Sequence, residues 1–224
     1  MAALPEKERL KECSVQKVQI PPLGLKGLLR VPSDAYGMIV FVHGSGSSRL
    51  SPRNNRVAEA LYDAQLATLL FDLLTDKEAS DRANVFDIDL LMDRLLQVLA
   101  WVRERQDTDS LPVGLFGAST GAAAALMAAS RSAEVAAVVS RGGRPDLAGP
   151  ALEQVKVPTL LIVGSLDTEV LALNRQALAR LGGKKDLQVV PGAGHLFEEP
   201  GVLDVVISLA RRWFEDHLRR PVRK

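Results

Sequence analysis

The feature that most constrains this chain is a serine between two glycines, at the junction of two apolar segments. Residues 117–121 read GASTG, directly after an apolar run over residues 111–116 and directly before an alanine-rich run over residues 122–129. This setting predicts a sharp turn from a strand into a helix, which pushes the hydroxyl of Ser119 out of the sheet, where a histidine can reach it. The glycines avoid collisions with the neighbouring strand and helix. An idle serine in a glycine-rich packing turn is the simpler alternative.

Short apolar runs predict strands buried on both faces, and amphipathic runs predict helices between them. The expected strands cover residues 38–42, 67–71, 112–116, 135–139, 159–163 and 187–190, with weaker strands over 15–20 and 27–31. The expected helices cover residues 52–65, 84–105, 120–131, 171–181 and 202–217, and the polar segment 75–82 is expected to be a loop. Strands that alternate with helices imply parallel pairing through right-handed crossovers. We therefore expect an α/β fold with a mainly parallel sheet.

The length of the chain fits one α/β domain over residues 1–224. A chain of 224 residues can bury a full core, and no repeat, low-complexity tract or linker divides it. Only a short segment separates the strand that ends at residue 139 from the strand that begins at residue 159. We therefore expect no large helical lid.

Charge and cysteine content limit the partners and the cellular location that we expect for the protein. A net charge of +1 supplies no long-range field that would gather nucleic acid or anionic membrane. Cys13 is the single cysteine, so no disulfide can form within the chain, and a reducing cytoplasm is the expected location. Residues 1–12 lack the apolar core of a signal peptide. The uncharged segment 111–130 contains Pro112 and three glycines, which fits strand, turn and helix better than a membrane span.

The C-terminal end of the chain is basic. A binding tail is one reading, but positive charge at the end of a last helix is favoured by the helix dipole, which is the explanation we prefer. The residues are Arg211, Arg212, Arg219, Arg220, Arg223 and Lys224.

A serine needs a base held against it before it can act as a nucleophile. Of three histidines, His195 follows the last expected strand, and an imidazole there suits proton relay near neutral pH. Asp167, at the end of the run LLIVGSLD, is the expected acid that orients His195, and Glu169 is the second choice. A solvated loop histidine and a helix-capping aspartate are the simpler alternatives. The order Ser119, Asp167, His195 is the chain order expected for such a triad on an α/β sheet.

Backbone N–H groups must face the oxygen that becomes negative in the transition state. The N–H of Thr120, next to the serine, is one expected donor. The second is expected from the loop HGSGSS over residues 43–48, with Ser45 as first choice and Gly46 as fallback. His43 is expected to shape this loop through hydrogen bonds, and His43, Gly44 and Gly46 are candidates for contact with the substrate.

The glycine-rich loop does not fit phosphate cradles. A dinucleotide fingerprint needs a third glycine where Arg49 stands, and a P-loop needs a Gly-Lys-Ser/Thr ending. We expect neither a metal nor a cofactor. Arginines in two loops of the expected active edge, Arg49 and Arg53, Arg141 and Arg144, could hold a substrate carboxylate or phosphate. Salt bridges that fix the loops are the equal alternative.

Six stretches spread along the chain carry a family resemblance. They are HGSGSSRLSPRN, LATLLFDLLT, GLFGASTGAAAAL, SRGGRPDLAG, PTLLIVGSLD and PGAGHLFEEPG. With them the chain resembles an α/β-hydrolase, and more narrowly a small lidless member of the dienelactone hydrolase-like group. It is similar to the stand-alone form of a hydrolase domain that some bacteria fuse to a phosphoribosyltransferase. The resemblance implies a twisted, mainly parallel sheet of about seven to eight strands and the triad named above.

One residue departs from the family pattern, because dienelactone hydrolases proper use a cysteine nucleophile where this chain has Ser119. We therefore expect cleavage of simple carboxylic esters with short acyl chains, rather than of dienelactone. Acyl transfer by the same residues and a non-catalytic scaffold of the same fold are the alternatives. The expected partner is a small ester, with no nucleic acid and no membrane, and a homodimer is left open. The segment 72–83 is hypothesised to act as a small movable flap.

Overall fold

The computed structural model describes residues 15–219. Expectations about Cys13, about residues 1–12 and about the final basic residues Arg220, Arg223 and Lys224 lie outside the described part. Within residues 15–219, no helix combines the length and apolar character that crossing a bilayer requires. The apolar segment 111–130 is divided between a strand, a turn and a helix, as its proline and glycines predict.

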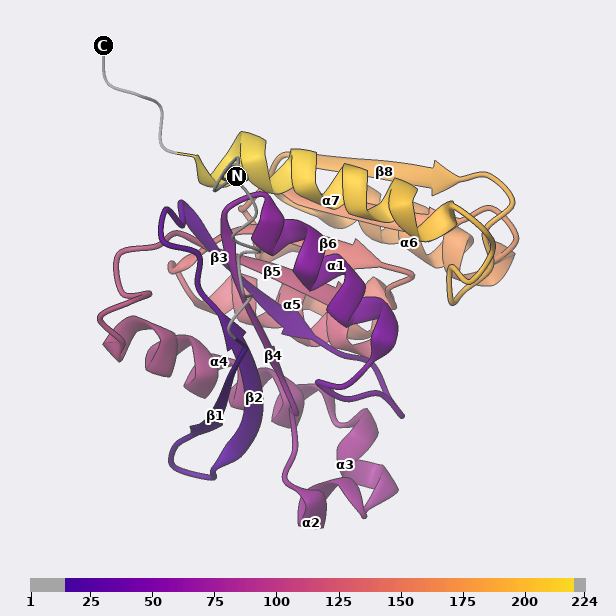
Figure 1. Cartoon of the computed structure of the whole chain (residues 1–224). Helices are drawn as coiled ribbons and strands as arrows, with labels where there is room; N and C mark the ends of the chain where they lie inside the picture. The colour runs from indigo at the N-terminus through magenta and orange to yellow at the C-terminus, as the bar shows by residue number, and fades with distance from the viewer. Residues whose placement is uncertain (1–14, 220–224) are drawn as a thin grey trace, which may run out of the picture.

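An eight-stranded, mostly parallel sheet forms the centre of the molecule (Figure 1). The strand order is β1-β2-β4-β3-β5-β6-β7-β8. The pairs β1/β2 and β2/β4 are antiparallel, and every other pair in this order is parallel. The strands are β1 (Gln16–Ile20), β2 (Leu25–Arg30), β3 (Gly37–Val42), β4 (Leu66–Phe71), β5 (Val113–Ala118), β6 (Val135–Arg141), β7 (Thr159–Gly164) and β8 (Lys185–Val190). The expected mainly parallel sheet is confirmed.

Helices cover both faces of this sheet, so it has a core on each side. On one face lie α1 (Pro52–Asp63) and α7 (Val202–Leu218), side by side in Figure 1. On the other face lie α4 (Ile88–Glu104), α5 (Thr120–Arg131), α6 (Thr168–Arg180) and the 3-10 segment η1 (Pro145–Gln154). Because the sheet is covered twice, β3, β4, β5 and β7 are buried at every position, which explains their uninterrupted apolar sequences. The segment η1 packs against α5 and α6.

Two expectations about the segment after β4 are wrong. The expected loop over 75–82 contains the helix α2 (Asp76–Ala79) and the start of α3 (Arg82–Phe86). Thr75 and Glu78 form a reciprocal capping box that stabilises α2. The expected single helix over 84–105 is interrupted at Asp87, whose backbone is extended and whose side chain accepts a hydrogen bond from Leu90 N–H to begin α4. The apolar periodicity continues through this break, and therefore hid it.

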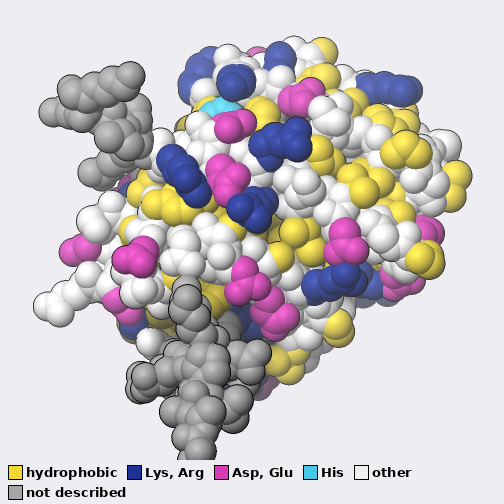
Figure 2. Space-filling model, turned by 45° about the horizontal axis from the view of Figure 1, so that its top comes forward, with side chains coloured by type: hydrophobic (Ala, Val, Ile, Leu, Met, Phe, Trp, Pro, Cys, Tyr) yellow, Lys and Arg dark blue, Asp and Glu magenta, His cyan; other side chains and the backbone are white. Residues whose placement is uncertain are grey.

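The surface carries both signs of charge in close mixture. On the face in Figure 2, Lys and Arg side chains lie among Asp and Glu side chains, and the described residues there form no large patch of one sign. This mixture agrees with the net charge of +1.

Candidate active site

Ser119 stands on a strained turn between β5 and α5. Its backbone has φ 49° and ψ −125°, a conformation that few non-glycine residues adopt. A Cβ on Gly117 would lie 2.5 Å from Ala122 Cα, and a Cβ on Gly121 would overlap the carbonyl oxygens of Val42 and His43. The steric reason for both flanking glycines is therefore confirmed.

The hydroxyl of Ser119 is not used to cap the helix that it precedes. Ser119 occupies the N-cap position of α5, but its side chain makes no capping hydrogen bond. Its backbone is instead hydrogen-bonded to β6 and to the segment that directly follows β6. The N–H of Ser119 donates to Arg141 O at 3.4 Å, and the N–H of Arg144 donates to Ser119 O at 3.0 Å. The turn is thus fixed through the main chain, and the hydroxyl keeps no local structural task.

His195 and Asp167 meet across two loops at the carboxyl edge of the sheet. His195 Nδ1 lies 2.6 Å from Asp167 Oδ2. Asp167 begins α6 as its N-cap residue, yet its side chain makes no capping hydrogen bond, so the helix-capping alternative for this carboxylate does not apply. Glu169, the second choice for the acid, is exposed. The side chain of Asp167 is 14% exposed and that of His195 is 39% exposed.

One cavity of about 550 Å³ brings Ser119 and His195 together. We call it the Ser119 cavity. Its other walls come from the loop after β3, the start of α1 and the ends of β5 and β6, which parallel strands place at one edge of the sheet. Within residues 15–219, the hydrogen bonds of His195 run through Nδ1 alone, which leaves Nε2 without a protein partner. The Ser119 cavity is lined by Gly44, Ser45, Gly46, Ser47, Ser48, Leu50, Ser51, Pro52, Arg53, Ala118, Ser119, Arg141, Gly142, His195 and Leu196.

The two expected backbone donors lie on touching segments, and one of them is engaged. The N–H of Ser45 donates to Thr120 Oγ1 at 3.0 Å. Gly44 packs closely on the turn at Ser119 between β5 and α5, which we call the elbow. A Cβ on Gly44 would lie 2.8 Å from Ser119 Cβ. Gly46 has φ 70°, which lets the loop turn away after Ser45. Only the N–H of Thr120 was expected to take part in the site, but its hydroxyl also does, because it ties the turn at Ser119 to the loop after β3.

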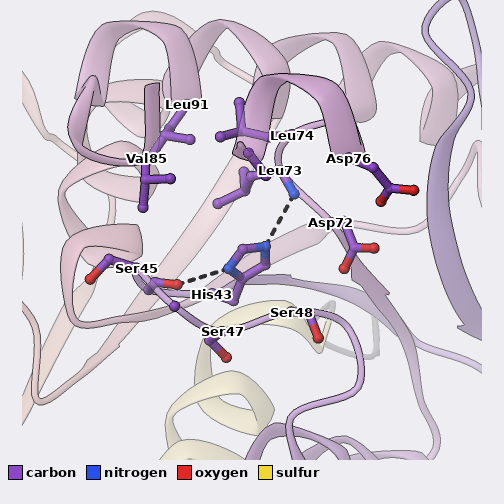
Figure 3. Close-up of a pocket in the computed structure, with 13 residues that line it drawn as sticks. His43, Ser45, Ser47, Ser48, Asp72, Leu73, Leu74, Asp76, Val85 and Leu91 are labelled. Atoms are coloured by element: carbon purple, nitrogen blue, oxygen red, sulfur yellow. Dashed lines mark hydrogen bonds between the residues drawn. The ribbon is translucent and has the colours of Figure 1, made fainter. Parts of the chain in front are cut away.

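His43 holds the loop after β3 in place through hydrogen bonds of both its ring nitrogens. The N–H of Leu73 donates to His43 Nε2 at 3.1 Å, so Nε2 is the unprotonated nitrogen, and Nδ1 donates to Gly44 O at 2.9 Å (Figure 3). Burial lowers the pKa of His43, against smaller opposing effects of the bond to Gly44 and the charge of Asp72. The expected hydrogen-bonding role in the loop agrees with these contacts.

The four arginines of the active edge differ in their partners. Arg49 is ion-paired with Asp72, and Arg144 pairs with Asp146 at 2.7 Å. Neither of these two lines the Ser119 cavity, whereas Arg53 and Arg141 do. Arg53 is ion-paired with Glu198 at the rim. Salt bridges that fix the loops therefore account for Arg49 and Arg144.

Arg141 is buried beside the nucleophile turn and has no acidic partner among the described residues. Its Nη2 donates to Asn54 Oδ1 at 3.2 Å, while Nε and Nη1 have no hydrogen-bond partner in the described protein. Burial, with the nearby charge of Arg53, lowers the pKa of Arg141 to about 10. The role of Asn54 was missed, although a buried polar residue on the apolar side of α1 was a visible signal.

Among the described residues, no group of three His, Cys, Asp or Glu side chains is placed to hold a metal ion. The site itself brings together a hydroxyl, an imidazole and a carboxylate, with two arginines nearby.

Comparison with known proteins gives the family of the chain. The model of the dienelactone hydrolase family matches residues 27–215. The chain belongs to this family. The fold is accordingly that of an α/β-hydrolase, and membership of the family indicates that the protein is a hydrolase. A solved structure of a dienelactone hydrolase from Anabaena variabilis is 53% identical, with a TM-score of 0.87 over 92% of this chain and 98% of that one.

Two further likenesses have a narrower meaning. Proteins from two strains of Mycobacterium tuberculosis, which bear the provisional name phosphoribosyl transferase, are 60% identical over 201 residues. The match covers 89% of this chain but only 45% of those proteins. A dienelactone hydrolase-like promiscuous phosphotriesterase from metagenomic libraries is 18% identical with a TM-score of 0.74, over 91% of this chain and 98% of that one, and it shares the fold.

Proposed function

We propose that this protein is a serine hydrolase of small carboxylic esters. The observation that carries the proposal is the convergence on one cavity of an uncommitted serine hydroxyl and a histidine whose other ring nitrogen is held by a carboxylate. A serine, a histidine and an acid in these relations recur on unrelated folds in acyl-transfer enzymes. A degenerate scaffold of the same fold would be expected to have lost at least one of the three.

In the proposed reaction, Ser119 Oγ attacks the ester carbonyl carbon and its proton passes to His195 Nε2. His195 then gives this proton to the departing alcohol oxygen, which leaves an acyl group on Ser119. Water, deprotonated by His195, attacks the acyl-enzyme and releases the acid. Asp167 holds the imidazole through Nδ1 and stabilises its charged form.

The backbone N–H groups of Ser45 and Thr120 are the proposed donors to the oxyanion. The N–H of Ser45 already donates to Thr120 Oγ1, so it must share or exchange this partner when the substrate oxygen becomes negative. The same bond keeps the loop after β3 against the turn at Ser119, next to the N–H of Thr120.

We further propose that the alcohol portion of the substrate carries an anionic group. Among the described residues, Arg141 is a buried cation without an acidic partner, and it lines the same cavity as Arg53, whose charge is paired with Glu198 at the rim. An uncompensated cation in a cavity with low-dielectric walls gives a positive potential there. The test compares phenyl acetate with 4-carboxyphenyl acetate. The wild type should prefer the carboxylated ester, Arg141→Lys should retain the preference, and Arg141→Met should lose it. Equal rates for both esters in the wild type would contradict the anionic substrate.

The nucleophile is tested by labelling with a fluorophosphonate, mapped by mass spectrometry, together with turnover of p-nitrophenyl acetate. We expect an adduct on Ser119, and loss of both label and turnover in Ser119→Ala. Ser33→Ala, an exposed serine between β2 and β3, serves as the matched control and should behave as wild type. A folded wild type that takes no label would overturn the proposal. Acyl transfer is distinguished from hydrolysis by adding a competing alcohol or amine and analysing the products.

A further inference from the structure

A second cavity of about 230 Å³ shares the loop 44–48 with the Ser119 cavity. We call it the His43 cavity (Figure 3). In the sheet order β4-β3-β5, the loop after β3 has the end of β4 on one side and the elbow after β5 on the other. The His43 cavity takes its remaining walls from the end of β4 and from α2, α3 and α4, so it lies on the side of the loop away from His195.

The titratable side chains that line the His43 cavity are already paired within the protein. Both ring nitrogens of His43 are bonded to the backbone. Asp72 accepts from the N–H and the guanidinium of Arg49, and Asp76 is paired with Lys26 at 2.6 Å. These groups therefore offer no uncompensated charge to a ligand.

What remains open to a ligand is mainly hydrocarbon. The side chains of Leu73, Leu74, Val85 and Leu91 surround the space above His43 in Figure 3. A cavity of about 150 Å³ with aliphatic walls is large enough to bind benzene. The volume and lining of the His43 cavity therefore suit one uncharged ring, or a branched chain of similar size.

The geometry of the proposed reaction decides which part of an ester can lie in the His43 cavity. The leaving oxygen must come within reach of His195, because His195 gives it a proton. The alcohol is thereby placed on the side of His195 and Arg141, in the Ser119 cavity. The acyl group extends from the carbonyl carbon away from the leaving oxygen, past the loop 44–48.

We propose that the His43 cavity is the acyl-binding subsite, and that it takes an uncharged aromatic or branched acyl group of about one ring in size. This inference rests on the proposed function. It also assigns a task to the segment after β4, whose helices α2 and α3 form the outer wall of the subsite.

That wall is tied in place by one acidic residue. Glu78 closes the capping box with Thr75, pairs with Arg94 of α4 at 2.5 Å, and accepts a hydrogen bond through its backbone oxygen from the side chain of Asn84. These contacts tie the outer wall of the subsite to α4 and so limit the length of the acyl group. The movable flap over residues 72–83 stays a prediction.

The test varies the acyl group and keeps the alcohol constant. The measured quantity is the ratio of kcat/KM for p-nitrophenyl benzoate to kcat/KM for p-nitrophenyl acetate. Val85→Phe fills the cavity and should lower this ratio at least about tenfold, since one methylene in a substrate pocket changes discrimination by about 10–200-fold. Val85→Ala should extend acceptance to the larger 2-naphthoate ester. Ala83→Phe is the matched control, because Ala83 is exposed on the same short helix and does not line the cavity.

A second readout is independent of hydrolysis. Binding of the neutral probe 4-fluorobenzyl alcohol is followed by ¹⁹F NMR, and we expect binding by wild type and Ala83→Phe but not by Val85→Phe. An unchanged ester ratio in a folded Val85→Phe variant, or an equal shift in Ala83→Phe, would overturn the subsite. Absence of probe binding to the wild type would also overturn it. Failure of the proposed function gives a different result, namely no fluorophosphonate label on Ser119 and no turnover of the acetate.

Discussion

His43 and His195 both follow strands at the carboxyl edge of the sheet, but their surroundings are opposite. His43, after β3, is half-buried and has both ring nitrogens bonded to the backbone. His195, after β8, is 39% exposed in its side chain, has one ring nitrogen on a carboxylate and keeps the other without a protein partner. A histidine at the ligand-binding edge of an α/β sheet is therefore not by itself a candidate base. A free nitrogen and an acid that orients the ring distinguish the two.

The largest expected effect comes from removing the free nitrogen. His195→Gln should lower kcat for p-nitrophenyl acetate by about 10⁴–10⁶-fold, because the serine loses its base. The measurement is steady-state turnover with active-site titration. Retention of more than a hundredth of the wild-type rate would remove the contrast between the two histidines.

The acid is tested by an isosteric change. Asp167→Asn keeps the shape of the contact with His195 but favours the wrong tautomer, which should cost about 10⁴-fold in kcat. Glu169→Gln is the matched control two residues away, and it should remain within about twofold of wild type. If Glu169→Gln were the more damaging change, the assignment of the carboxylate would be wrong.

Loss of the hydrogen bond from the N–H of Ser45 to Thr120 Oγ1 should lower kcat by an intermediate amount. Thr120→Val removes the hydroxyl that accepts the N–H of Ser45 but keeps the side-chain shape. Since loss of one oxyanion donor costs about 10²–10³-fold in kcat, a misplaced donor should cost about tenfold or more, with KM little changed. Thr120→Ser should restore most of the rate. A rise in kcat for Thr120→Val would mean that the hydroxyl competes with the substrate for this donor.

The smallest effect on chemistry, and a clear effect on stability, is expected at His43. His43→Phe keeps a ring but leaves the N–H of Leu73 and the oxygen of Gly44 without partners, which should lower the free energy of unfolding by about 1–3 kcal/mol. Urea unfolding at pH 7.5 measures the loss. An unchanged free energy of unfolding would show that the loop does not depend on these bonds.

The same variant tests the titration of His43. Burial lowers its pKa in the folded state below the ordinary value of 6.5, so the unfolded chain binds the proton first as pH falls. The stability contribution is therefore complete well above pH 6.5 and declines as pH falls through 6.5 toward the lowered folded-state pKa. His43→Phe should lack this part of the decline. A parallel pH dependence in wild type and variant would contradict the assignment.

Local patterns predicted most of the sheet and the turn at Ser119. The buried strands could be predicted from their apolar runs. The glycines around Ser119 stand at positions where a Cβ cannot fit. The breaks at Asp87 and within residues 75–82 could not be found in this way, because capping by Thr75 and Asp87 depends on single side-chain contacts that leave the apolar periodicity unchanged.

The sequence by itself determined which residue types stand at the carboxyl edge of the sheet, because strand order and chain direction deliver the loops after parallel strands to one side. Only the tertiary structure decided which of them meet: Asp167 rather than Glu169 beside His195, Arg49 paired with Asp72 while Arg141 has no acidic partner within residues 15–219, and the N–H of Ser45 on the hydroxyl of Thr120. Such contacts join residues 23 to 75 positions apart. Their distances are set by how the sheet twists and the helices pack, and neither is encoded in the spacing of residues along the chain.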